Sequence, residues 1–116
     1  KKHRISESWL QYYEPTSGGG HNQHKHCNWN REEDTDHFMC SGGYYLADGD
    51  PLLDHPYSGV FSFHLRDYQQ MIRVKKGLLM MWPSDIVHSV KPFYGQNYRA
   101  VINFNIRSTA IKTKLL

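Results

Sequence analysis

Residues 77–105 read GLLMMWPSDIVHSVKPFYGQNYRAVINFN, and this stretch decides the fold. It predicts three strands, over residues 78–82, 86–90 and 98–106, because each segment is rich in apolar and β-branched side chains. A Pro-Ser-Asp turn separates the first two strands, and the polar segment KPFYGQN forms a loop before the third. The stretch therefore predicts antiparallel β-structure with short connections.

Alternation along the last strand separates two sets of side chains. One face carries Arg99, Val101, Asn103 and Asn105, and the other carries Ala100, Ile102, Phe104 and Ile106. An arginine buried without a partner is costly, so an inward-facing Arg99 predicts a bound anion. The planar guanidinium fork suits a carboxylate. The apolar face must be covered, either in the core or on the outside of the molecule.

Two histidines near the start of the chain have the spacing of metal ligands. His24 and His26 stand at i and i+2, so on a strand both imidazoles point the same way and can reach one ion. Imidazole ligands suit Fe, Zn, Cu, Ni or Mn. The alternative is that HNQHKH is a polar loop of solvated histidines. His88 lies eleven residues before Arg99, so a metal ligand and an anion clamp could share one cavity.

The composition favours one all-β domain over residues 1–116. Eight Tyr, five Phe and three Trp are typical of strands, and no segment keeps a helical period. We expect about eight short strands in a sandwich or barrel. The chain begins with Lys rather than Met, which is consistent with a C-terminal piece of a longer chain.

Charge and hydropathy exclude several classes of protein. The formal charge of +3 is mild and its basic ends are short, which disfavours nucleic acid as a partner. No apolar run is long enough to span a membrane, and no signal peptide opens the sequence. The two cysteines form no CxxC pair and no disulfide framework, so a reducing cytoplasm is expected.

The ordered motifs resemble the C-terminal half of 2-oxoglutarate/Fe(II)-dependent oxygenases, in the group with prolyl-hydroxylase-like and phage-encoded members. The matching residues are the HxH pair, the strand SGGYYL, Gly77, Pro83-Ser84, His88, Arg99 and Asn103-Phe104-Asn105. The resemblance implies a double-stranded β-helix, or jelly roll. It also implies a cytoplasmic enzyme of a bacterium or a phage-infected cell.

The resemblance further implies the site and its chemistry. Fe(II) would be held by His24, His26 and His88. The far carboxylate of 2-oxoglutarate would be held by Arg99 with help from Tyr45, and Asn103 would bond the co-substrate or the substrate. The enzyme would be a dioxygenase that uses O2 to hydroxylate an unidentified substrate, with succinate and CO2 as co-products.

Two positions depart from the family pattern: Gly43, where the family usually has Val, and His26. The family usually has Asp or Glu where this chain has His26, so three neutral imidazoles would leave Fe(II) at a charge of +2 rather than +1. A carboxylate from the polar insertion over residues 28–36, at Glu32, Asp34 or Asp36, is the alternative. Substrate choice would lie in this insertion and in the loops over residues 52–58 and 93–97, none of which carries a substrate signature.

Two other interpretations stay open. A cupin-type metalloenzyme would use Glu32 as a fourth ligand and need no 2-oxoglutarate. A metal-free jelly roll would serve as a binding or structural module, with Arg99 turned to solvent. Members of the oxygenase family also carry N-terminal helices over the outer face of the larger sheet. Here upstream sequence or a second subunit, in a homodimer, would cover the apolar face.

Overall fold

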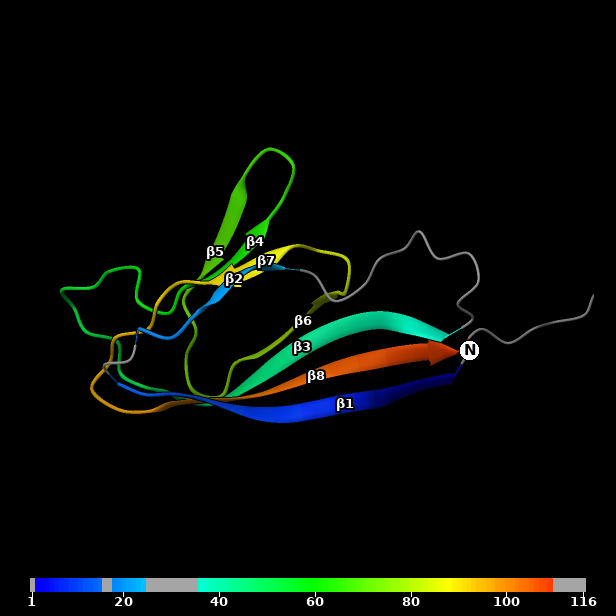
Figure 1. The fold of residues 1–116 in the computed structure, drawn as a ribbon, viewed down its shortest axis with the longest axis horizontal. Helices are drawn as coiled ribbons and strands as arrows, with labels where there is room; N and C mark the ends of the chain where they lie inside the picture. Colours follow the sequence, from blue (N-terminus) through cyan, green and yellow to red (C-terminus); the bar gives the residue numbers. More distant parts are fainter. Residues whose placement is uncertain (1, 16–17, 25–35, 110–116) are drawn as a thin grey trace, which may run out of the picture.

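The computed structural model describes residues 2–15, 18–24 and 36–109, and every regular element within these ranges is a strand (Figure 1). No helix that could cross a membrane forms in this part of the chain. The strands are β1 (Lys2–Tyr13), β2 (His21–His24), β3 (Asp36–Asp48), β4 (Phe61–His64), β5 (Gln69–Ile72), β6 (Leu79–Pro83), β7 (His88–Val90) and β8 (Arg99–Thr109).

The strands form two antiparallel sheets of four. The first sheet has the order β1-β8-β3-β6, and the second has the order β2-β7-β4-β5. Strands that pair in this way, first with last and second with seventh, arise when the chain folds back on itself once and the double ribbon rolls into two layers. This is a jelly roll, so the predicted all-β double-stranded β-helix is confirmed.

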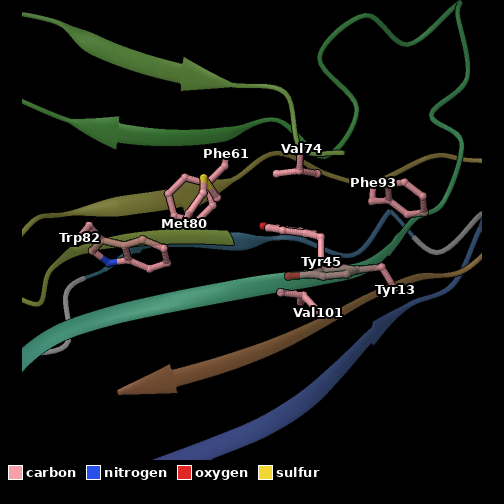
Figure 2. Packing of buried hydrophobic residues seen from close by; sticks show 8 residues of the cluster. All are labelled: Tyr13, Tyr45, Phe61, Val74, Met80, Trp82, Phe93 and Val101. Atoms are coloured by element: carbon pink, nitrogen blue, oxygen red, sulfur yellow. The ribbon is translucent and has the colours of Figure 1, made fainter. Parts of the chain in front are cut away.

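The core lies between the two sheets. Alternation along β6 buries Met80 and Trp82, and it leaves Leu79 and Met81 exposed. Figure 2 shows how the buried cluster fills the space between the layers. Its members are Tyr13, Tyr45, Phe61, Val74, Met80, Trp82, Phe93 and Val101.

The strands at the two ends are longer than the sequence predicted. The sequence predicted a last strand over residues 98–106, but β8 continues to Thr109, and β1 starts at Lys2, within the basic N-terminal segment. The two strands pair along their whole length, from Lys2 opposite Thr109 to Tyr13 opposite Arg99. Backbone pairing alone extends them, since the polar side chains at these ends give no alternation that a sequence pattern could detect.

The outer face of the first sheet is apolar. Every second side chain of β8, starting at Ala100, points outward, away from the core between the sheets. Residues on the neighbouring strands share that face, since Leu10 and Tyr44 both lie opposite Ile102. The large apolar side chains exposed on this face are Ile5, Leu10, Tyr12, Tyr44, Leu79 and Met81. The sequence predicted that upstream residues or a second subunit cover this face, and this stays a prediction.

Candidate functional site

One cavity lies between the two sheets, and strands from both layers contribute to its wall. Alternation along β1 directs every second side chain inward, and β8 does the same. The lining residues are Trp9, Gln11, Tyr13, His24, Tyr45, Phe61, Trp82, His88, Val90, Val101 and Asn103. We call this the histidine cavity. It brings together four of the six predicted site residues.

His24 and His88 face one another in this cavity. They are directly opposite in the β2–β7 pair, and their ring centroids are 4.1 Å apart with planes inclined by 56°. His88 is buried, and its Nδ1 lies 3.0 Å from the carbonyl oxygen of Ile86. Because a carbonyl only accepts hydrogen bonds, Nδ1 carries the proton. The Nε2 lone pair of His88 is therefore the one suited to a metal.

Aromatic side chains fix the orientation of the His88 ring. The Phe61 ring stacks on it at 5.5 Å with planes inclined by only 10°, and the Trp82 ring lies 5.0 Å away. Trp82 is itself buried, and its Nε1 has no hydrogen-bond partner among the described residues. A buried N–H group without a hydrogen-bond partner lowers the stability of the fold. A ligand bound beside His88 could accept a hydrogen bond from it.

The third predicted metal ligand, His26, lies outside the described residues, as do Glu32 and Asp34. Among the side chains that the structure describes, no third His, Cys, Asp or Glu joins the pair of imidazoles. His24 and His88 could supply two of the ligands of a first-row transition metal. The Ile86 carbonyl, by holding Nδ1 of His88, orients the Nε2 lone pair of that ring. The three-histidine set itself stays a prediction.

Arg99 is the most deeply buried charged group in the described structure, with 1% of its surface exposed. Its Nε donates to the carbonyl oxygen of Asp48 at 3.0 Å, and its Nη1 donates to that of Gly59 at 2.6 Å. The guanidinium carbon lies 4.6 Å from the Phe93 ring centroid and 5.9 Å from that of Tyr45. Arg99 therefore does not point into solvent. The hypothesis of a metal-free module predicted that it would.

Arg99 forms no close ion pair with a described carboxylate, although the charge of Asp48 acts on it. Within the described residues, no carboxylate lies within ion-pair distance of its guanidinium, which contacts carbonyl oxygens and aromatic rings. Burial lowers the pKa of Arg99, while the nearby Tyr45, Tyr13 and Asp48 raise it. A cation held in this way costs free energy unless an anion binds it.

Two tyrosines lie between Arg99 and the histidines. Arg99 packs on Phe93 at one end of the core, His88 packs beside Trp82 at the other, and the hydroxyl groups of Tyr13 and Tyr45 point from the first end toward the second (Figure 2). Burial raises the pKa of Tyr45 to about 12 and raises that of Tyr13 as well, although Arg99 opposes both shifts. Both phenols are therefore neutral donors at physiological pH.

Tyr13 was missed by sequence reasoning, and so were Trp9 and Gln11. Alternation in WLQYY places these three on one face, but both faces of that strand carry aromatic or apolar side chains, so the pattern does not say which face is inward. Pairing with β8 decides it, since Tyr13 lies opposite Arg99. The predicted residue Asn103 is half-buried in the same cavity, and its amide donates to Gln11 Oε1 at 3.0 Å.

The remaining motif residues have a structural role. Ser41 Oγ donates to Asn105 Oδ1 at 2.7 Å and lies 2.9 Å from Ser84 Oγ, all three being buried. Asn105 Nδ2 in turn donates to Glu7 Oε2 at 3.1 Å. This network joins β1, β8, β3 and the turn after β6. It accounts for the serine of the Pro-Ser turn and for the second asparagine of Asn-Phe-Asn without any contact with the histidine cavity.

Solved oxygenase structures share this fold. A prolyl-4-hydroxylase from Pseudomonas putida matches with a TM-score of 0.64 and 21% identity, over 91% of this chain and 54% of that one. A prolyl hydroxylase from Trichoplax adhaerens, in complex with a hypoxia inducible factor peptide fragment, matches with 0.60 and 19%, over 89% and 46%. A nickel complex of the non-heme monooxygenase ThoJ matches with 0.64 and 11%, over 94% and 47%.

These likenesses establish the fold. No protein-family model matches the sequence, and no curated protein matches it. The chain spans about half the length of the three solved proteins. Its double-stranded β-helix is thus the one found in prolyl-4-hydroxylases and in other non-heme oxygenases, while its activity has to be inferred from the site.

Proposed function

We propose that this domain is an Fe(II)- and 2-oxoglutarate-dependent dioxygenase that hydroxylates an unidentified substrate and releases succinate and CO2. One observation carries the proposal. A buried arginine without a carboxylate partner among the described residues lies in the same core as two facing histidines. A small molecule with a metal-chelating end and an anionic end would satisfy both groups, and 2-oxoglutarate is such a molecule.

The residues that would hold the metal are His24 and His88, with His26 as the third ligand. Bound there, Fe(II) would supply the activation of O2 and the oxidative decarboxylation of the co-substrate. The hydrogen bond from His88 Nδ1 to Ile86 fixes the tautomer in which Nε2 is a ligand. Phe61 and Trp82 pack against the His88 ring and exclude water from it.

The far carboxylate of the co-substrate would bind Arg99. Two of the five guanidinium N–H groups bind backbone carbonyls, which leaves donors for a charge-assisted contact. Tyr13 and Tyr45 line the histidine cavity, and the charge of Arg99 acts on both of them. Their neutral hydroxyls would orient the bound acid. Asn103, on β8 between the strands that carry the two tyrosines, would bond the co-substrate or the substrate.

The test is an anaerobic titration with Fe(II) and then with 2-oxoglutarate, monitored by the weak visible charge-transfer band of a chelated 2-oxo acid. We expect the band in the wild type and a much weaker one in Arg99→Met, which removes the charge and keeps an apolar side chain in the core. Arg66→Ala, at an exposed arginine, is the control and should keep the band. An Arg99→Met band equal to the wild type would refute the assigned role of Arg99.

A second candidate is a cupin-type metalloenzyme that needs no 2-oxoglutarate. It is favoured by one observation, that Arg99 belongs to the wall of a neighbouring cavity and not to that of the histidine cavity. This enzyme would bind metal through the histidines and give no charge-transfer band with the 2-oxo acid. A folded chain that binds no metal at all would exclude both enzymes and leave the metal-free module.

A further inference from the structure

We propose that a second cavity, which shares Arg99 with the core, binds the phosphoryl group of a small molecule. This basic cavity is lined by Asp48, Asp50, Arg73, Lys75 and Arg99 among other residues, and its volume is about 380 Å³. It lies between the connection from β3 to β4 and the connection from β5 to β6, which meet at one end of the molecule (Figure 1). The oxygenase proposal uses Arg99 but neither Arg73 nor Lys75.

Both carboxylates of the basic cavity accept hydrogen bonds from other parts of the chain. Asp48 accepts hydrogen bonds from the backbone N–H groups of Asp50 and Lys76, each at 3.0 Å, and these bonds lower the pKa of Asp48. Asp50 Oδ2 accepts from the side-chain amide of Asn97 at 2.7 Å. The hydrogen bonds to both carboxylates thus come from neutral donors, although the charges of Arg99 and Lys75 also lower the pKa of Asp48.

The three cations of the basic cavity form no ion pair with a described residue. No carboxylate in the described part of the chain lies within ion-pair distance of Arg73, Lys75 or Arg99. Arg73 and Lys75 are exposed at the rim, whereas Arg99 is buried in the wall, where its charge is poorly screened. Three cations against two carboxylates leave the cavity with a net positive charge, with a guanidinium and an ammonium that can move onto a ligand.

This arrangement selects a compact anion of high charge. A guanidinium binds two oxygens of a phosphate at once, and a lysine supports it as a point charge. The cavity is concave and small, and the whole chain carries a formal charge of only +3, so a small phosphorylated molecule fits it better than a nucleic acid does. His24, His88 and Tyr45 do not line it, so its occupant needs no metal.

Inorganic phosphate is the probe, titrated into the full chain by calorimetry with chloride adjusted to hold the ionic strength constant. We expect saturable binding by the wild type and an affinity lower by about tenfold or more in Arg73→Gln/Lys75→Gln, because two charge-assisted contacts are lost. The control is Arg66→Gln/Lys91→Gln, which removes the same charge from exposed positions away from the basic cavity. Its affinity should stay within about twofold of the wild type.

Two results would overturn the proposal. One is the absence of saturable phosphate binding by the wild type. The other is equal weakening in both double variants, which would show that phosphate responds to net charge and not to this cavity. All four substituted side chains are exposed, so both variants should fold, and neither outcome depends on metal binding at the histidines.

Discussion

Replacing Gly59 by alanine tests whether the Arg99 guanidinium is held where the structure places it. Gly59 has a φ of 61°, and a Cβ there would lie 2.6 Å from Arg99 Cζ and 2.7 Å from Nη2. Its carbonyl oxygen also accepts the hydrogen bond from Arg99 Nη1. Alanine would therefore both strain the backbone and push the guanidinium away from its acceptor.

The two costs can be separated with a matched control. A left-handed conformation costs a non-glycine residue about 1–2 kcal/mol, and a lost hydrogen bond to a charged group costs about 1.5–3 kcal/mol. Gly59→Ala should therefore lower the free energy of unfolding by about 2.5–5 kcal/mol. Gly77 has a φ of 86°, and no heavy atom lies within 4 Å of the position that a Cβ would take there. Gly77→Ala should therefore lose only the backbone contribution, about 1–2 kcal/mol.

Urea denaturation of the two variants measures both losses, and the dependence on denaturant should match the wild type. A domain typically has a free energy of unfolding of about 5–15 kcal/mol, so Gly59→Ala should unfold at a much lower urea concentration than Gly77→Ala. Equal losses in Gly59→Ala and Gly77→Ala would refute the reasoning, because they would mean that the Arg99 guanidinium does not pack against the Gly59 backbone.

Three further predictions concern stability and association. The pKa of Tyr45 is raised to about 12 in the folded chain, against an ordinary value near 10. Its contribution to stability should therefore be complete below that ordinary value and vanish as pH rises to about 12. Urea unfolding across this range should show a smaller fall in the free energy of unfolding for Tyr45→Phe than for the wild type, and an identical fall would contradict the shift. Phe93→Ala should destabilise the chain by about 3–5 kcal/mol, since Phe93 is fully buried against Tyr13 and Arg99; chemical denaturation giving a loss under about 1 kcal/mol would count against this packing. Leu79→Lys/Met81→Lys, on the exposed outer face, should change the free energy of unfolding by less than about 0.5 kcal/mol per site. If a second copy covers that face, the variant should self-associate less in sedimentation velocity, and unchanged sedimentation would argue against the homodimer.

The sequence by itself determined that the chain is built of strands and which neighbouring side chains share a face. Period-two alternation is local, because each side chain points opposite to its neighbour whatever the strand pairs with. The alternation in residues 98–106 was therefore enough to place Arg99 and Asn103 together on one face and Ala100 on the other, while the packing of the two sheets decided which face is inward. The same rule separates Tyr45, which is buried, from the exposed Tyr44.

The tertiary structure alone decided which strands meet and in what register. His24 faces His88 because β2 pairs with β7, and Tyr13 joins the site because β1 lies beside β8. It also decided that Arg99 borders the basic cavity, where two distant connections meet. These contacts join residues far apart in the chain, and they depend on how the double ribbon rolls up, which no local pattern of side chains encodes.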